Sequence, residues 1–349
     1  MKVLSVVGAR PQFVKLAPIV SALANRCEHV IVHTGQHYDE RLSDVFFSDL
    51  GIPHPDVDLG IGSAPHGAQT GAMLSALEPV LQQQDPDWVL VYGDTNSTLA
   101  GALAAVKLHL PVAHLEAGLR SFNRRMPEEH NRVLTDHAAD LCLAPTEEAM
   151  RHLAAEGLAD RSVLVGDVMT DVCLATAAAL TDGPWPGPPD LAGTPYTVAT
   201  LHRPDNTDDP ERLADVLSAF AELPRPVLLL AHPRLVARAE EHGVTLQRGR
   251  IRVLPAQPYP ALVGLVQRAA SVITDSGGLQ KEAFLLRVPC TTVRAETEWP
   301  ETVALGWNSL CPDPRDLAAV DARPAPEATN AAPYGDGHAA ERVARVLLG

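Results

Sequence analysis

The sequence lacks the features that would place the chain in a membrane. No apolar run approaches the roughly 18–20 residues that a helix needs to span a bilayer. Residues 1–8 are too short for a signal peptide and are predicted to form a first strand. We therefore expect a cytoplasmic protein with no membrane partner.

The sequence also lacks motifs for a bound metal or a nicotinamide. Its 5 cysteines are scattered without a CxxC pair, which predicts buried free thiols in a reducing cytoplasm. The histidines show no HxH or HExxH spacing, so a metal site has little support. No predicted strand is followed by GxGxxG, which argues against NAD. We expect neither a metal nor an organic cofactor.

Basic residues are few, with 28 Lys and Arg against 43 Asp and Glu, and the net charge is −15. A nucleic-acid partner needs a basic footprint, so this balance argues against one. A small anionic ligand is not excluded, because it needs only a local basic cluster.

The chain contains short apolar runs that alternate with helix-like segments. Its 349 residues suggest about two domains, and apolar strands separated by helices predict parallel sheets buried on both faces. The predicted strands are 3–8, 29–35, 87–94, 111–117, 141–145 and 163–167, then 196–202, 227–232, 251–254, 271–274 and 289–293.

The segment 181–193 is rich in proline and glycine and is predicted to be a linker. It divides the chain into two Rossmann-like, doubly wound α/β domains at 1–180 and 194–335. A final helix at 338–349 is expected to pack back on the first domain. Such sheets bind ligands at the carboxyl ends of their strands, so we expect an active site in a cleft between the domains.

Residues 274–282, TDSGGLQKE, form the most informative motif. They join a predicted strand to a predicted helix, so the N–H groups of Ser276, Gly277 and Gly278 surround a helix N-terminus that favours a diphosphate. Glu282 follows about one and a half turns later, where a carboxylate can accept both hydroxyls of a ribose. A plain βα loop that uses glycine for its geometry is the alternative.

Charged residues also follow the strands of the first half. Arg10 and Lys15 flank a predicted helix start, where cations oppose the helix dipole. A bound anion explains them better than a solvated helix end does. Glu116 ends an apolar strand, a costly place for an unpaired carboxylate, so it is a stronger site candidate.

Other candidates have simpler explanations. Asp94 is either a site residue or the cap of the next helix. Glu128 is either a site residue or the i+4 partner of Arg132, and local sequence favours the ion pair. His202 and His232 each end a predicted strand. A single histidine there is usually structural, but two that face the proposed diphosphate site favour a functional role.

Together these motifs resemble the non-hydrolysing UDP-N-acetylglucosamine 2-epimerase family. Each motif is modest alone, but they occur in order over nearly the whole chain. The matching stretches are GARP (8–11) with Lys15, TGQH (34–37), GDT (93–95), HLEAGLR (114–120), PEEHNR (127–132), TDSGG (274–278) with Glu282, TEWPE (297–301) and PYGDG (333–337).

The resemblance implies a glycosyltransferase-B arrangement of two domains, a homodimer, and a role in cell-surface polysaccharide synthesis. It implies inversion of C2 of a UDP-linked 2-acetamido sugar, interconverting UDP-GlcNAc and UDP-ManNAc. Residues that would surround the sugar and diphosphate are Arg10, Lys15, Asp94, Glu116, Glu128 and His202. Residues that would hold the nucleotide are Gln257, Ser276, Gly277, Gly278 and Glu282.

The residues present are consistent with that chemistry. Without NAD, the inversion is expected to eliminate UDP across C1–C2 and add it back to a 2-acetamidoglucal. Asp94, Glu116, Glu128 and His202 would carry protons on the two faces, and Arg10 and Lys15 would stabilise the departing diphosphate. Which carboxylate removes the C2 proton stays open.

Some positions depart from the family pattern. Trp299 replaces an arginine found in many bacterial members, and relatives that act on a diacetamido uronic acid also carry tryptophan there. Arg294 is a candidate replacement for that arginine. Asp39 and Ala68 replace a Gln and an Arg of the activating UDP-GlcNAc site, which predicts weak or no activation by substrate. A hydrolysing relative, a glycosyltransferase and a nucleotide-sugar sensor are the competing hypotheses.

Overall fold

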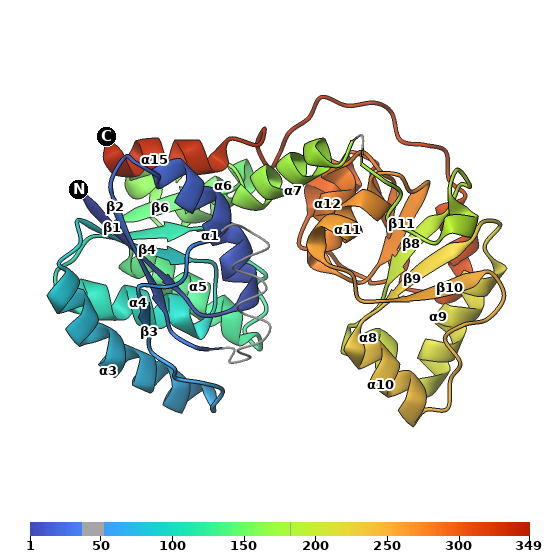
Figure 1. The fold of residues 1–349 in the computed structure, drawn as a ribbon, viewed down its shortest axis with the longest axis horizontal. Helices are drawn as coiled ribbons and strands as arrows, with labels where there is room; N and C mark the ends of the chain where they lie inside the picture. Colours follow the sequence, from blue (N-terminus) through green and yellow to red (C-terminus); the bar gives the residue numbers. More distant parts are fainter. Residues whose placement is uncertain (37–51, 182) are drawn as a thin grey trace. The chain divides into compact units, whose positions relative to one another are not determined.

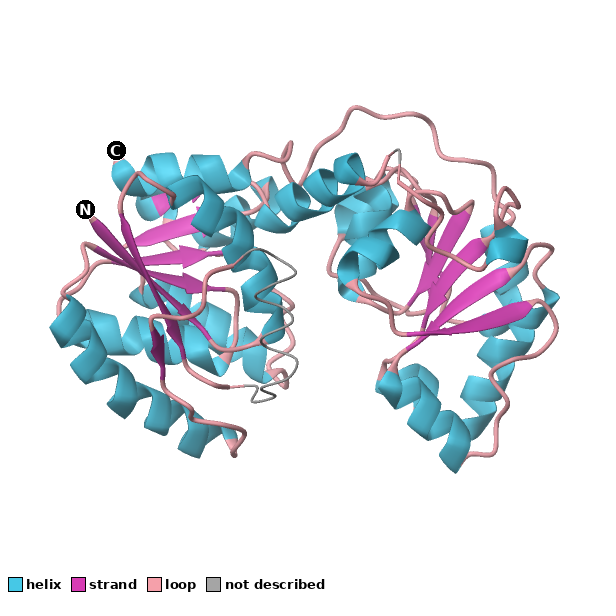
Figure 2. Cartoon of the chain, in the orientation of Figure 1, coloured by secondary structure: helices cyan, strands magenta, loops and turns pink. Residues whose placement is uncertain are grey.

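The computed structural model of the chain describes residues 1–36, 52–181 and 183–349, and of Arg10 it describes only the backbone. These residues form two compact units, residues 1–172 with 332–349 and residues 173–331. Figure 1 shows the course of the chain through the two units. Helices and strands alternate within each unit (Figure 2), and each unit has its own sheet and core.

The first unit is built on a seven-stranded parallel sheet of order β3-β2-β1-β4-β5-β6-β7. The strand order reverses between β1 and β4, and sheets of this kind bind ligands at the carboxyl ends of the strands beside such a point. The strands are β1 (Lys2–Val7), β2 (Glu28–His33), β3 (Val57–Asp58), β4 (Trp88–Tyr92), β5 (Val112–Leu115), β6 (Leu141–Ala144) and β7 (Ser162–Leu164).

Helices cover both faces of this sheet. Alternate residues of β1 enter opposite cores, with Val3 in the core under α1 and Leu4 in the core under α3 and α4. The helix α15 lies beside α1 (Figure 1), although it comes from the carboxyl end of the chain. The helices are α1 (Arg10–Leu23), α3 (His66–Gln84), α4 (Asn96–Lys107), α5 (Pro127–Ala138), α6 (Glu147–Ala155) and α15 (Ala339–Leu348).

The second unit has a six-stranded parallel sheet of order β10-β9-β8-β11-β12-β13. The strands are β8 (Thr197–Thr200), β9 (Val227–Ala231), β10 (Ile251–Pro255), β11 (Ser271–Thr274), β12 (Cys290–Thr292) and β13 (Asn308–Leu310). The helices that accompany it are α8 (Pro204–Thr207), α9 (Pro210–Glu222), α10 (Pro233–Glu241), α11 (Tyr259–Val266), α12 (Gly277–Leu285), α13 (Pro300–Ala304) and α14 (Leu317–Asp321). The division between the units falls within α7 (Val168–Ala179).

The helix α9 shows how local sequence builds this core. Asp209 caps its first turn by accepting the N–H groups of Glu211 and Arg212. Its buried residues recur at helical spacing from Leu213 to Phe220, so one face of the helix is apolar. Each such buried side chain contributes about 1.5–3 kcal/mol, which holds the helix against the sheet.

The predicted pair of parallel α/β units is confirmed. The strands β3 and β13 lie outside the predicted strands. The strand β3 has only 2 residues, too few for a readable periodicity. Within the segment 181–193, Trp185 packs against Tyr196 with ring centroids 5.3 Å apart. All five cysteines lie in the described part and are unbridged.

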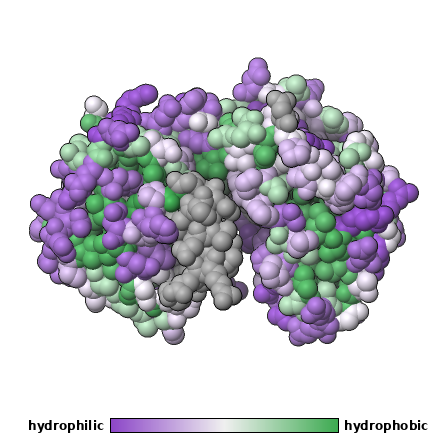
Figure 3. Space-filling view, in the orientation of Figure 1, coloured by the Kyte–Doolittle hydropathy of each residue, from purple (hydrophilic) through white to green (hydrophobic). Residues whose placement is uncertain are grey.

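The described surface exposes few large apolar side chains. Those that are exposed are Met1, Phe122, Leu134, Leu164 and Val303. The face drawn in Figure 3 mixes hydrophilic and apolar patches on each unit. Among the described helices, none combines the length and the apolar character that crossing a membrane requires.

Candidate active site

Charged side chains of the first unit gather at the carboxyl edge of its sheet. Lys15 comes from α1, Asp94 follows β4, and Glu116 follows β5. Lys15 forms an ion pair with Glu116, and the two side chains are only 12% and 14% exposed. Burial alone would lower the pKa of Lys15, but the carboxylates of Glu116 and Asp94 raise it above its ordinary value. The lysine is therefore held as a cation between these carboxylates.

Glu116 has an unusual backbone conformation. Its φ is +74°, in the left-handed region that non-glycine residues rarely adopt. Gly93 lies against the ion pair, since a Cβ at this position would be 3.1 Å from Glu116 Oε2 and 3.2 Å from Lys15 Nζ. Strained residues of this kind occur at functional sites, where the surrounding structure holds them in place.

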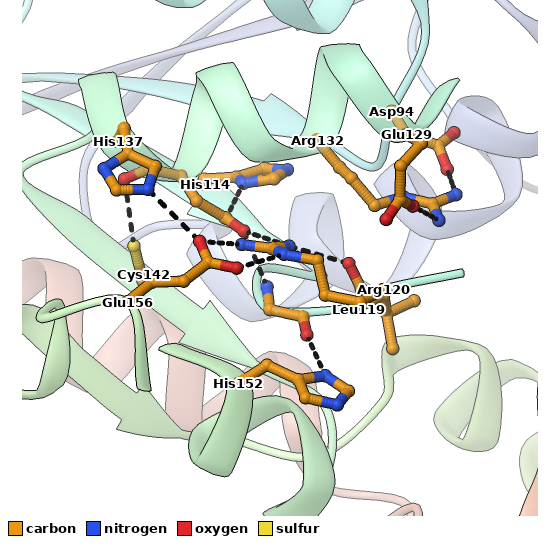
Figure 4. A network of polar contacts seen from close by, with 12 residues as sticks. Asp94, His114, Leu119, Arg120, Glu129, Arg132, His137, Cys142, His152 and Glu156 are labelled. Carbon is orange, nitrogen blue, oxygen red and sulfur yellow. Dashed lines mark hydrogen bonds and ion pairs between the residues drawn. The ribbon is translucent and has the colours of Figure 1, made fainter. Parts of the chain in front are cut away.

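Arg132 on α5 forms ion pairs with the carboxylates of Asp94 and Glu129, as Figure 4 shows. One guanidinium nitrogen pairs with Asp94, and another donates to Glu129 Oε2 at 2.8 Å. The expected pairing of Arg132 with Glu128 is wrong. The alternative role of Asp94 as a helix cap is also wrong, because Thr95 caps α4 with its side chain.

Glu129 is buried and holds the loop that precedes α5. Its two oxygens accept the N–H groups of Ser121 and Phe122 at 2.9 and 2.8 Å. Burial alone would raise the pKa of Glu129, but these donors and Arg132 lower it below its usual value. Glu128, in the same helical turn, is half-buried, and its carboxylate has no partner among the described residues.

The turn from β1 to α1 differs from a phosphate-binding loop. Gln12 is buried, and its side-chain oxygen accepts the N–H groups of Gly8 and Ala9 at 2.8 and 3.0 Å. Pro11 has no N–H to offer. The N–H groups of Gly8 and Ala9 are therefore not available to an anion at this helix start. Of the first-unit residues singled out in the sequence, His37 and Asp39 lie outside the described residues, as does the side chain of Arg10.

In the second unit, His202 follows β8 and contacts the carboxylate of Asp275, which follows β11. The fully buried Asp275 carboxylate accepts the backbone N–H groups of His202 and Arg203, and it lies 3.2 Å from His202 Nδ1. Burial alone would raise the pKa of Asp275, but His202 and these N–H groups lower it below its ordinary value. The rings of His202 and His232 have centroids 5.3 Å apart. The imidazole of His202 is thus oriented by a buried carboxylate.

The N-terminus of α12 offers unpaired donors. Ser276 precedes the helix, and its own N–H donates to Thr274 Oγ1 at 2.9 Å. The N–H groups of Gly277 and Gly278 have no partner in the part of the chain that the structure describes. A Cβ at Gly278 would meet no atom within 4 Å, so space is open there. Free donors at the positive end of a helix bind anions.

A carboxylate already lies close to this helix start. A Cβ at Gly277 would be 3.2 Å from Glu298 Oε2. Arg294 donates to both oxygens of Glu298 at 2.9 Å, and Arg203 donates to Oε1 at 3.3 Å. Arg294, the candidate replacement for the arginine that the TEWPE motif lacks, therefore lies beside the α12 N-terminus.

Trp299 has a structural role in the second unit. Its indole nitrogen donates to the carbonyl of Gly277 at 2.9 Å. The ammonium of Lys281 lies 4.3 Å from the centre of a Trp299 ring, within cation–π range. The side chain is only 8% exposed, so it supports the glycine turn from the protein interior through this hydrogen bond.

The remaining predicted nucleotide residues are placed as follows. Glu282 is buried in α12, and Tyr259 lies close to it. Burial and the carboxylate of Glu282 raise the pKa of Tyr259. Gln257 folds onto its own loop, donating to the carbonyl of Pro255 at 2.8 Å.

Sequence reasoning missed several residues of these clusters. Arg132 was considered only as a helix-pairing partner, and Gln12, Asp136 and Asp275 were not singled out as contributors to the sites. The roles of Asp136 and Asp275 depend on contacts between distant positions, and Asp136, for instance, bonds His114 across 22 positions. A buried charged residue in an amphipathic helix is the one signal that could have pointed to Asp136.

Each unit thus places charged groups at the carboxyl edge of a parallel sheet. Two such Rossmann-like domains, with these groups, define an enzyme of the glycosyltransferase-B-like α/β class. A family model described as UDP-N-acetylglucosamine 2-epimerase matches residues 21–348. The chain belongs to this family and is an isomerase.

Individual relatives agree with this assignment. The chain is 46% identical to the UDP-2,3-diacetamido-2,3-dideoxy-D-glucuronate 2-epimerase of Pseudomonas aeruginosa, with 99% of both chains covered. It is similar to the crystal structure of Methanocaldococcus jannaschii UDP-GlcNAc 2-epimerase in complex with UDP-GlcNAc and UDP, with TM-score 0.83, 38% identity and 99% of both chains covered. It also resembles the Neisseria meningitidis UDP-GlcNAc 2-epimerase bound to UDP-GlcNAc, with TM-score 0.85, 28% identity and 100% of both chains covered.

Proposed function

We propose that the chain inverts C2 of a UDP-linked 2-acetamido sugar, converting UDP-GlcNAc to UDP-ManNAc by elimination and re-addition of UDP. The observation that carries this proposal is the cluster around Lys15. Asp94 and Glu116 both lie close enough to Lys15 to raise its pKa. The carboxylates supply a proton acceptor, and the lysine between them supplies a cation for a departing phosphate.

The elimination needs a base because no carbonyl activates the C2 proton. A carboxylate takes this proton, the C2–H electron pair forms the C1=C2 double bond, and the C1–O bond breaks with its electrons leaving on UDP. The re-addition reverses these steps after a proton is delivered to the other face of C2. Asp94, Glu116, Glu128 and His202 are the proton carriers that we propose for the two faces.

The second unit is proposed to hold the nucleotide. The free N–H groups of Gly277 and Gly278, together with Ser276, favour the diphosphate. Glu282 is proposed to accept the ribose hydroxyls, and Gln257 to contact the nucleotide. Arg10 and Lys15 are proposed to neutralise the diphosphate as it leaves.

Most of the proposed proton carriers belong to the first unit, whereas the nucleotide residues belong to the second. The proposed reaction therefore uses residues of both units. We further propose a cytoplasmic homodimer that supplies cell-surface polysaccharide synthesis. Analytical ultracentrifugation would then give about twice the chain mass of 37.2 kDa, whereas a monomer would contradict the dimer.

A second candidate substrate is a UDP-linked 2,3-diacetamido uronic acid. Two observations favour it: the 46% identity to an enzyme named for that sugar, and Trp299 in the TEWPE motif. Elimination across C1–C2 would be the same, and only the groups on the more distant ring carbons would differ.

Proton NMR of the products tests the proposal and separates the alternatives. The protein is incubated with UDP-GlcNAc and, separately, with the UDP-diacetamido uronic acid. A mixture of two UDP-sugars from either substrate supports a 2-epimerase, and the faster substrate identifies the sugar. Free UDP with free ManNAc would indicate a hydrolysing enzyme, and no turnover of either donor alone would contradict the proposal.

A further inference from the structure

One buried carboxylate of the first unit, Asp136, bonds to residues on both sides of Glu116. Asp136 lies on α5, and its side chain is fully buried. One of its oxygens lies 2.6 Å from Nδ1 of His114, two residues before Glu116. The other accepts the N–H of Gly118 at 3.0 Å, two residues after Glu116.

The strand end held in this way is tightly packed. Gly118 has a φ of +83°, and a Cβ there would be 2.5 Å from the carbonyl oxygen of Ala149. Arg120 also reaches the Asp136 carboxylate, with an N–O distance of 2.7 Å. The residues around Glu116 therefore have three bonds to one carboxylate that water does not reach.

His114 connects Asp136 to the backbone beside Asp94. Its Nε2 lies 2.7 Å from the carbonyl oxygen of Gly93, the residue before Asp94. The imidazole is fully buried, so this bond is shielded from solvent. One carboxylate thus fixes the backbone at two of the proposed proton carriers.

Both side-chain contacts of His114 run to oxygen acceptors. A carbonyl oxygen and an ionised carboxylate can only accept hydrogen bonds, so both ring nitrogens of His114 must donate. Burial alone would raise the pKa of Asp136, but His114 and Arg120 lower it below its usual range. Both ring nitrogens of His114 therefore face hydrogen-bond acceptors in the fold.

Arg120 closes the network away from the site. It donates to both oxygens of Glu156, at 2.7 and 2.8 Å. Figure 4 shows the side chains of His114, Arg120 and Glu156 in this network. The guanidinium of Arg120 thus lies against the carboxylates of Asp136 and Glu156, which offsets the cost of burying these charges.

We propose that Asp136 is a positioning residue, which holds Glu116 in its left-handed conformation and, through His114, fixes Gly93 beside Asp94. It acts through the backbone and does not touch the substrate. The catalytic part of this proposal rests on the proposed function, since it assigns Glu116 and Asp94 to the reaction. A misplacement of about 1 Å at such a group can cost about 100-fold in rate.

The kinetic test compares Asp136→Asn with Asp140→Asn. Asp140 accepts the N–H of Val112 at 2.9 Å, so it holds the opposite end of the same strand in the same chemical way. Asp136→Asn is expected to lower kcat about 10- to 100-fold, with KM and UDP affinity changed less than about 3-fold. Asp140→Asn is expected to keep kcat within about 2-fold. Equal values of kcat in the two variants would overturn the catalytic part.

A crystal structure of Asp136→Asn gives a second readout. Glu116 is expected to leave the φ of +74° seen in the parent chain. An unchanged conformation of Glu116, with Gly93 in place, would overturn the positioning role. This outcome does not depend on the substrate, so it stays readable if neither UDP-sugar is turned over.

Nitrogen-15 NMR of the unmodified protein gives a third readout, which remains available if Asp136→Asn does not fold. Because both contacts run to acceptors, both ring nitrogens of His114 are expected to carry protons. A neutral His114, with one unprotonated nitrogen, would show that it does not donate to both Asp136 and Gly93. The proposed link from Asp136 to Asp94 would then be wrong.

Discussion

Lys15 and Glu116, which are 101 positions apart in the sequence, form an ion pair at the carboxyl edge of the first sheet. Because the neighbouring carboxylates raise the pKa of Lys15, its positive charge persists across the physiological pH range. The lysine lies against the Glu116 carboxylate in a place with little water. The ion pair thus brings together the residues proposed as a base and as a cation for the leaving diphosphate.

Replacing Glu116 with glutamine should abolish most of the turnover. The amide keeps the shape of the side chain but cannot accept the C2 proton, so kcat should fall about 100- to 10,000-fold. UDP affinity, measured by isothermal titration calorimetry, should change little because UDP is proposed to bind the second unit. Glu147→Gln, at an exposed position in the first turn of α6, is the control. Wild-type kcat in Glu116→Gln would remove this residue from the mechanism.

The buried carboxylate of Glu129 makes part of the stability depend on pH. Its pKa is lowered in the folded chain from the ordinary value of 4.5. Its contribution is therefore fully present above about pH 4.5 and is lost as the pH falls through the folded pKa.

Glu129→Gln should accordingly lower the free energy of unfolding at pH 7 by about 1–3 kcal/mol. The difference from the parent chain should shrink as the pH falls below about 4.5. Urea unfolding of both proteins between pH 7 and pH 4 measures this difference in the free energy of unfolding. A difference that grows on acidification would contradict the assignment of Glu129 as an ionised acceptor.

Trp299 should act on nucleotide binding through Gly277. Trp299→Phe keeps an aromatic ring beside Lys281 but removes the hydrogen bond to the carbonyl of Gly277. The loss of about 0.5–1.5 kcal/mol should weaken UDP binding about 2- to 12-fold, with a smaller change in kcat.

Trp307→Phe is a matched control for that substitution. Trp307 is buried to a similar degree, and its indole nitrogen has no hydrogen-bond partner among the described residues. Its replacement should leave UDP affinity within about 2-fold, as measured by calorimetry. Equal losses in both variants would show that ring packing, and not the bond to Gly277, governs the effect.

The rate should depend hyperbolically on UDP-GlcNAc concentration. Ala68 lies exposed on α3 and cannot replace the guanidinium that the resemblance places in an activating site. Initial rates over a wide range of UDP-GlcNAc concentrations measure the shape of this dependence. A strongly sigmoidal curve would contradict it.

The sequence predicts the two sheets because their strands are continuous apolar runs. It also identifies Glu116 as a site candidate, since an acidic residue at the end of a buried strand needs a partner. It does not identify that partner, because pairing Lys15 with Glu116 requires the packing of α1 against the sheet.

Local rules failed where distant contacts are stronger. Helical spacing favoured a pair between Glu128 and Arg132, but Arg132 instead bonds Glu129 and Asp94. The carboxylate of Asp94 comes from the end of β4, and no local pattern places it beside α5. Sequence thus predicted which residues are charged at the strand ends, and the fold decided which of them pair.

Exchange of the C2 proton in deuterated water tests the central claim most directly. The protein is incubated in D2O with UDP-GlcNAc and with the UDP-diacetamido uronic acid, and the C2 position is followed by proton NMR. Elimination and re-addition predict that the inverted UDP-sugar carries deuterium at C2. Inversion with full retention of the original C2 proton would contradict removal of this proton by the carboxylates around Lys15.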